Sequence, residues 1–254
     1  MSTVAQNGHV TRALGTLGAV AIFFGRLVMQ GGRVWARPGL VVAQIHNAGG
    51  RSVVIIMLSG LFTGMVLALL GFNLLQRFGS EEALGFAAAL AMVKELGPVL
   101  TALLFAGRAG TALTSEIGLM RATDQLTAME MMAVDPMGYI AAPRFFGGVI
   151  SMPLLTAVFD VVGLFGAWLV GVRMMGVDNG SFWSQMQSSV NLHDVSEGIA
   201  KSVVFGITGS LIAVYEGYHS EPTAEGVGLA TTRTVVASSV LVLLLDYMLT
   251  AAFL

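Results

Sequence analysis

The chain has 254 residues, of which 55% are hydrophobic and only 11% charged, less than half of the roughly 25% found in a soluble domain. Thirteen basic and fifteen acidic residues leave a net charge of −2, which excludes a basic surface for nucleic acid. The lack of cysteine excludes disulfides, thiolate metal sites and cysteine nucleophiles, and the four histidines are scattered, so no metal site is predicted. This composition indicates an all-α integral membrane protein.

The first apolar stretch lies within residues 12–37, where Arg26 interrupts it and further arginines border it. It lacks the small-residue cleavage site of a signal peptide. We expect an amphipathic helix that lies in the membrane interface, with its arginines reaching toward lipid headgroups. The alternative is a sixth membrane span.

Five later stretches are long enough to cross the hydrocarbon core of a bilayer, which takes about 20 residues of helix. The predicted spans are residues 52–76, 83–107, 145–172, 198–215 and 234–254, and residues 1–254 are predicted to form a single domain. If the N-terminus is cytoplasmic, nine arginines lie on the cytoplasmic side and only Arg77 and Arg173 on the other. This positive-inside bias places the C-terminus on the outer, periplasmic side.

The connector between the second and third spans, residues 108–144, contains a predicted short cytoplasmic helix at residues 123–135. Pro136 is expected to end this helix, because the residue before a proline is disfavoured in helical conformation. An apolar face rich in methionine suits the docking of a partner, and the alternative is an ordinary re-entrant connector. The residues at helical spacing on this face are Leu126, Met129, Met132 and Ala133.

Several segments carry longer, more specific motifs. They are Lys94-Glu-Leu-Gly-Pro98, Phe105-Ala-Gly-Arg-Ala-Gly110, Glu116-Ile-Gly-Leu-Met-Arg121, Met129-Glu-Met-Met-Ala-Val-Asp-Pro136, Pro143-Arg144 and Thr231-Thr-Arg-Thr-Val-Val236. On these motifs, the chain from about residue 40 to its C-terminus closely resembles the MlaE/YrbE permeases.

The resemblance implies the membrane subunit of an ABC transporter that moves phospholipid in the inner membrane of a Gram-negative cell and maintains outer-membrane lipid asymmetry. It also implies a homodimer of the permease, an MlaF-like ATPase that binds ATP and Mg, an MlaB-like STAS protein and a hexamer of an MlaD-like MCE protein. The family's coupling helix corresponds to residues 123–135. The residues expected to couple to the ATPase are Glu116, Arg121, Asp124, Leu126, Met129, Glu130, Met132 and Asp135.

The sequence contains no phosphate-binding loop of the G-x-x-x-x-G-K-[ST] type. The chain is therefore predicted not to be an enzyme, and any energy from ATP must come through a separate subunit.

Charged residues are predicted inside the spans, where each should face protein or a water-filled cavity. We expect an intramembrane charge network with pairing between helices, for example Lys201 with Asp246 or Glu95 with a lysine of another helix. Whether this network is structural or a moving relay is left open. Its predicted members are Lys94, Glu95, Asp160, Lys201 and Asp246.

The outer half of the first span carries large apolar side chains at helical spacing, which could instead simply face bilayer lipid. In the family that the chain resembles, the substrate cavity lies at the dimer interface near the outer ends of the first spans. The predicted substrate-binding residues are Leu67, Leu70, Leu74, Leu75, Phe78 and Glu95. Gly60 and Gly64 offer a surface for close helix packing.

Three other functions remain as alternatives. One is a permease of an MCE system that imports sterols or other hydrophobic molecules. Another is an ion-coupled secondary transporter, which the absence of duplicated halves disfavours. The last is a structural or anchoring membrane subunit.

Overall fold

The computed structural model describes residue 15, residues 18–35 and residues 37–253, and this part of the chain is helical without any β-strand. Five helices in it are long and apolar enough to cross a membrane: Pro38–Gln76, Glu81–Ala122, Met137–Met174, Leu192–Tyr218 and Ala224–Phe253. The all-α membrane fold and the number of spans are therefore as predicted. The helices extend beyond the predicted apolar stretches because polar residues at the ends continue the helical backbone.

Several of these long helices contain short segments with altered hydrogen bonding. The α-helices are α2 (Gly31–Trp35), α3 (Pro38–Gln44), α4 (Val53–Gln76), α5 (Leu84–Leu90), α6 (Gly97–Phe105), α7 (Thr111–Ala122), α8 (Gln125–Met131), α9 (Ala142–Trp168), α10 (Asn179–Ser189), α11 (Leu192–Tyr218) and α12 (Ala224–Phe253). The π-helical segments are Ile45–Gly49, η4 (Ala91–Leu96), Ala106–Gly110, Met137–Ala141 and Leu169–Met174, and the 3₁₀ segments are Gly50–Ser52 and Glu81–Ala83.

Helices α4 and α9 pack closely through glycine. Gly60 lies against the carbonyl of Phe159, and Gly64 against the carbonyl of Gly163, so that a Cβ atom at either glycine would collide with the backbone of α9. Small residues let two membrane helices approach and gain van der Waals contact. The predicted close-packing surface is therefore present.

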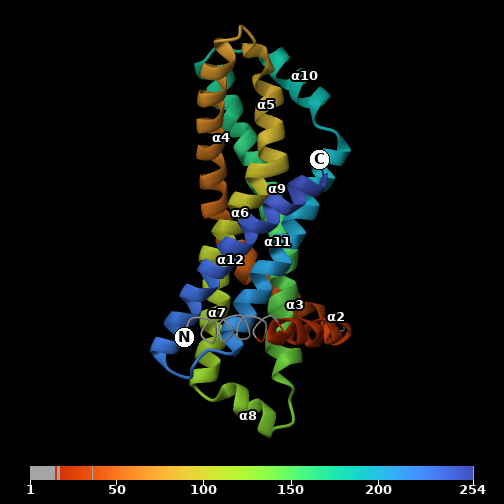
Figure 1. Cartoon of the computed structure of the whole chain (residues 1–254), viewed down its shortest axis with the longest axis vertical. Coiled ribbons are helices and arrows are strands. Elements are labelled where there is room, and N and C mark those ends of the chain that lie inside the picture. Colours follow the sequence, from red (N-terminus) through yellow and green to blue (C-terminus); the bar gives the residue numbers. More distant parts are fainter. Residues whose placement is uncertain (1–14, 16–17, 36, 254) are drawn as a thin grey trace, which may run out of the picture.

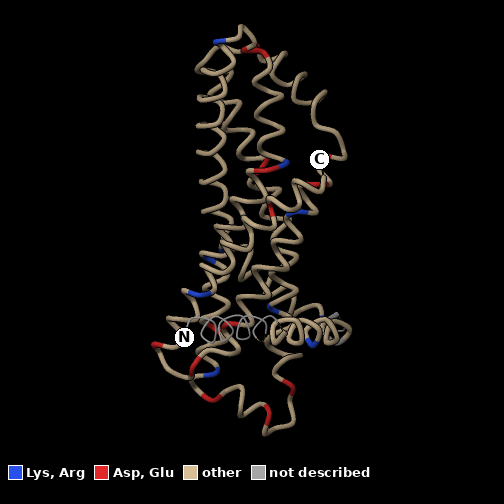
Figure 2. The backbone as a smooth tube through the Cα atoms, in the orientation of Figure 1, with Lys and Arg blue, Asp and Glu red and all other residues tan. Residues whose placement is uncertain are grey.

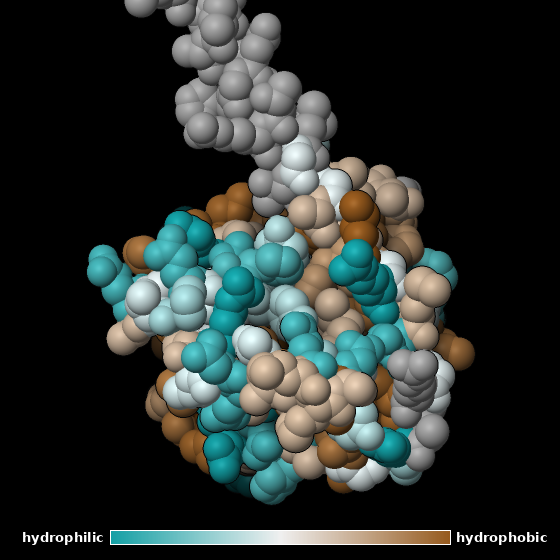
Figure 3. All heavy atoms as spheres, turned by 90° about the horizontal axis from the view of Figure 1, so that it is seen from below, coloured by the Kyte–Doolittle hydropathy of each residue, from teal (hydrophilic) through white to brown (hydrophobic). Residues whose placement is uncertain are grey.

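The bundle has two distinct ends (Figure 1). One end holds α8 and the turn between α11 and α12, and the other holds α10 and the turn between α4 and α5. Most Lys and Arg residues lie in the half of the molecule that contains α8, as Figure 2 shows. Seen from that end, hydrophilic residues gather across the face (Figure 3), which is typical of a membrane protein surface in water.

The N-terminal helix Gly18–Met29 is too short to span a bilayer, and together with α2 it lies across the long axis of the bundle (Figure 1). Its Phe23 packs on α11, with ring centroids 5.5 Å from Tyr215 and 5.7 Å from Tyr218. Residues 12–14, 16–17 and 36 of the predicted interfacial stretch lie outside the described residues.

Helix α8 is shorter than the predicted stretch 123–135. Ala133 adopts a left-handed conformation with φ of 59°, and the N–H of Val134 donates to the carbonyl of Met129 at 2.9 Å. This is the Schellman arrangement that closes helix C-termini. The helix therefore ends at Met131, before Pro136 can act.

Candidate functional site

A buried lysine lies at the centre of the membrane-embedded charges. The ammonium group of Lys201 lies 2.8 Å from Glu95 Oε1 and 3.5 Å from Asp246 Oδ1. It also donates to Thr250 Oγ1 at 2.8 Å and to the carbonyl of Lys94 at 3.0 Å. Both pairings predicted from the sequence, Lys201 with Asp246 and Glu95 with a lysine of another helix, are thus present.

Lys94 points to a second group of acids. Its ammonium group lies 3.1 Å from Asp194 Oδ1 and 2.9 Å from Glu197 Oε2, both near the start of α11. Lys94 and Glu95 are adjacent and so project about 100° apart around their helix, which separates their partners. A cavity of about 70 Å³ connects the two groups and is lined by Lys94, Glu95, Glu197, Lys201, Thr250 and Phe253.

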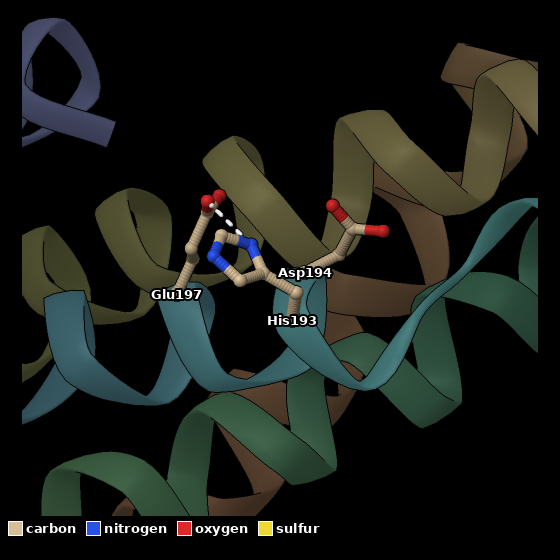
Figure 4. A group of neighbouring side chains, drawn as sticks. All are labelled: His193, Asp194 and Glu197. Atoms are coloured by element: carbon tan, nitrogen blue, oxygen red, sulfur yellow. Dashed lines mark ion pairs between the residues drawn. The ribbon is translucent and has the colours of Figure 1, made fainter. Parts of the chain in front are cut away.

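The start of α11 gathers side chains of metal-ligand type. Figure 4 shows His193, Asp194 and Glu197, with the ring of His193 turned toward the carboxylate of Glu197 at 2.9 Å. Lys94 already contacts both carboxylates. Because this lysine neutralises the acids where a cation would bind, the geometry favours an ion-pair cluster.

Asp160 does not belong to the network, contrary to the prediction. Among the described residues it has no ion pair, and its buried Oδ1 has no hydrogen-bond donor. Asp160 lies on α9, and its carboxyl group occupies the space that a Cβ atom at Gly97 would fill.

Asp194 and Glu197, which pair with Lys94, are network members in place of Asp160. The sequence does not predict them, because the predicted fourth span starts at residue 198. The signal was available, since Asn191 and Asp194 form a capping box that marks the true start of α11.

The apolar residues predicted to bind substrate near the end of the first span fall into two groups, one half-buried and one exposed. Leu67 and Leu75 are half-buried and pack on the protein's own apolar clusters. Leu70, Leu74 and Phe78 are 62%, 58% and 75% exposed. These three recur every four residues, Leu70 and Leu74 on α4 and Phe78 in the turn that follows it, and the described part of the same chain does not cover them.

Helix α8 has a buried side and an exposed side. Leu126 is buried in the apolar cluster that also holds Phe23 of the N-terminal helix. Met131 and Met132 are 85% and 67% exposed. Leu126 and Met132 were predicted to share one face, but the early end of α8 carries Met132 out of the helix, and Met131 is an exposed residue that the sequence reasoning missed.

The turn after α8 is attached to the N-terminal helix. Gln30 Nε2 donates to Asp135 Oδ2 at 2.7 Å. Hollows of about 570 and 480 Å³ lie beside this turn, and both are lined by Ala133, Val134 and Asp135. The turn after α8 is therefore joined to the residue that follows the N-terminal helix.

Two residues predicted to couple to an ATPase make contacts within the chain. The side chain of Glu116 pairs with the buried Arg144 at 3.3 Å and joins α7 to α9. Arg121 donates to the carbonyl of Tyr218 at the end of α11. Asp124 occupies the N-cap of α8 without a side-chain capping bond, and Glu130 is exposed beside Met131.

Comparison with known proteins decides the family. The sequence pattern of the family "Permease MlaE" matches residues 41–252. The chain is 53% identical over 241 residues to the intermembrane phospholipid transport system permease protein MlaE of Haemophilus influenzae, covering 94% of this chain and 91% of that protein. The chain belongs to the MlaE permease family.

More distant relatives match most of the chain in sequence. A probable ABC transporter permease protein of Rickettsia typhi is 36% identical over 211 residues, which cover 83% of this chain and 82% of that protein. The chloroplastic protein TRIGALACTOSYLDIACYLGLYCEROL 1 of Arabidopsis thaliana is 29% identical over 237 residues, which cover 92% of this chain and 67% of that protein. Members of the MlaE permease family are thus membrane subunits of ABC transporters, and this chain is a non-catalytic subunit of that kind.

Proposed function

We propose that this permease moves phospholipid between the inner membrane of a Gram-negative bacterium and a periplasmic MCE protein, and so maintains outer-membrane lipid asymmetry. The observation that carries the proposal is the 53% identity, over nearly the full length of both chains, to a permease named for intermembrane phospholipid transport. The α8 end is then cytoplasmic and the α10 end periplasmic. This orientation agrees with the concentration of basic residues in the α8 half.

Helix α8 serves as the docking element for an MlaF-like ATPase that binds ATP and Mg. Its exposed Met131 and Met132 suit this role, since unbranched thioether side chains adapt to a partner surface. Leu126 holds the helix to the bundle, so that a push on α8 reaches the apolar cluster beneath it. Met129, Glu130 and Asp135 lie near the exposed methionines and belong to the same proposed docking surface for the ATPase.

The lipid cavity forms between two copies of the chain. One protomer leaves Leu70 and Leu74 uncovered on the periplasmic half of α4, and Phe78 uncovered in the turn that follows it. In a twofold dimer the same stripe recurs on the other copy, and the two stripes then face one cavity. Leu67 and Leu75 support the wall of this cavity, and Glu95, with a partly exposed side chain, lies at its polar floor.

The remaining partners occupy the two ends of the permease. An MlaD-like MCE hexamer receives or delivers lipid at the periplasmic end, and an MlaB-like STAS protein binds on the ATPase side. The N-terminal helix lies in the cytoplasmic membrane interface, where its orientation across the bundle and the exposed Ile22, Val28 and Met29 suit contact with acyl chains.

A charge placed on the exposed methionines tests the coupling role of α8. Met132→Asp should weaken copurification of the ATPase and ATP-dependent lipid transfer to the MCE protein by about tenfold or more, because an unpaired charge is desolvated in the interface. Met174→Asp is the matched control, since Met174 is 66% exposed against 67% for Met132 but lies at the other end of the bundle. Full ATPase binding and transfer in a Met131→Asp, Met132→Asp double variant would contradict the assignment.

A further inference from the structure

A groove between α9 and α11 has a volume of about 220 Å³ and is almost entirely apolar. Val161 is 69% exposed and Ile199 51% exposed, so the groove opens sideways from the bundle. Its residues on α11 lie on a different face of that helix from the residues of the charge network. The lining residues are Val93, Pro153, Thr156, Ala157, Asp160, Val161, Leu164, Val195, Gly198, Ile199 and Ser202.

The carboxyl group of Asp160 is the one charged group in the lining of this groove. Its Oδ1 atom is buried against Gly97 and has no hydrogen-bond donor among the described residues. Because Asp160 lines the groove, its carboxyl group is within reach of a ligand there. The hydroxyl groups of Thr156 and Ser202 cannot serve Asp160, because they donate to the carbonyls of Met152 and Ile199 in their own helices.

A second acceptor at the groove also lacks a donor, for a separate reason. In an α-helix the carbonyl of Val93 would accept from the N–H of Gly97, but in η4 that N–H donates to Met92 instead. The next residue, Pro98, has no N–H to donate. The carbonyl of Val93 consequently lies against Gly198 of the groove without a backbone donor from its own helix.

The groove lies at the middle depth of the bundle. Asp160 follows Phe159, whose carbonyl packs on Gly60 in the interior of α4. A carboxylate at this depth needs a counter-ion or a proton. The groove combines two acceptors without donors, apolar walls and no basic side chain, which complements a cationic group with several N–H donors on an apolar body.

We propose that the α9–α11 groove binds a primary ammonium group carried on an aliphatic chain, with Asp160 as the counter-ion. The ammonium donates to Asp160 and to the Val93 carbonyl, while the chain lies among Val161, Leu164 and Ile199. Such a group occurs on a single-chain amine and on the ethanolamine headgroup of a phospholipid. The lining of this groove shares no residue with the stripe proposed for the lipid cavity.

Photolabelling of the full chain in phosphatidylglycerol nanodiscs tests the site. The probes are dodecylamine bearing a diazirine and the matching dodecanol, and the labelled peptides of α9 and α11 are identified by mass spectrometry. The amine should label these peptides about tenfold more than the alcohol, as expected for hydrogen bonds to a charged group. Asp160→Asn should bring this ratio close to one while leaving labelling by the alcohol unchanged, which shows that the groove is intact.

Asp178→Asn is the matched control, since it removes a carboxylate at the N-cap of α10, where asparagine also caps well. It should keep the wild-type ratio. Competition by phosphatidylethanolamine in the nanodisc would support the site and identify the headgroup as a source, whereas labelling that resists it would support the site for single-chain amines. Equal labelling by amine and alcohol in the wild type, or an unchanged ratio in Asp160→Asn, would overturn the proposal.

Discussion

Lys201 places the three N–H donors of a fully buried ammonium group on oxygens from two other helical segments. Glu95 and the carbonyl of Lys94 belong to η4, and Thr250 belongs to α12. Pro98 contributes indirectly, because it has no N–H to donate to the Lys94 carbonyl four residues earlier. A buried charge of this kind is tolerated only when its hydrogen-bonding capacity is filled.

Removal of the Lys201 charge should destabilise the protein strongly. Lys201→Met leaves the carboxylates of Glu95 and Asp246 without their cation, and we expect the free energy of unfolding to fall by about 3–5 kcal/mol. Chemical denaturation in detergent measures this change. A Lys201→Met, Glu95→Gln double variant should recover part of the loss, and a single variant as stable as the wild type would show that the pairs contribute nothing.

Part of this site could be predicted from the sequence. Charges are rare in membrane helices and must find partners, so the pairing of Lys201 with Glu95 and Asp246 follows from residue type and position in the spans. Asp160 met the same criterion, but its carboxyl group packs against Gly97 and pairs with none of these residues, and only the packing of α9 shows this. Asp194 was missed because hydropathy marks where apolar residues begin, not where a helix begins.

At the scale of elements, α4 and α9 form the most extensive helix contact in the described part of the chain, and this contact depends on glycine. A Cβ at Gly64 would collide with the carbonyl of Gly163, and one at Gly60 with that of Phe159. The four-residue spacing predicted this surface correctly. The partner helix could not be predicted, because small-residue pairs occur in many membrane helices.

Gly64→Ala should separate α4 from α9. The added methyl group has no space against the α9 backbone, and overpacking of this kind costs about 1–3 kcal/mol. Gly228→Ala is the control, since nothing lies within 4 Å of a Cβ built on Gly228 in α12. Thermal unfolding in detergent should show a lower midpoint for Gly64→Ala alone, and equal midpoints for both variants would contradict the packing described above.

Helix α8 shows where sequence patterns fail at this scale. An apolar face was assigned to Leu126 and Met132 on the premise that the helix continues to residue 135. The left-handed Ala133 instead closes the helix two residues after Met131, which separates a buried anchor from an exposed contact. Alanine has no preference for this conformation, so no residue type signalled the turn.

The whole molecule is a helical bundle whose two ends differ in charge. Part of its apolar side surface is not covered by the chain itself. Leu70 and Leu74 on α4 and Phe78 in the turn after it are exposed in the described structure. The number of spans and the family could be predicted from hydropathy and motifs. The arrangement of two copies could not, because one sequence describes only one side of a twofold interface.

The central claim is that Leu70, Leu74 and Phe78 line a phospholipid cavity that the ATPase opens and closes. The most direct test places a photoreactive amino acid at Phe78 in the full complex and compares phospholipid adducts with and without ATP. Leu154, 56% exposed on α9, is the control for contact with bulk lipid. We predict that ATP changes the adduct yield severalfold at Phe78 and leaves it unchanged at Leu154, whereas equal yields at Phe78 in both nucleotide states would contradict the account.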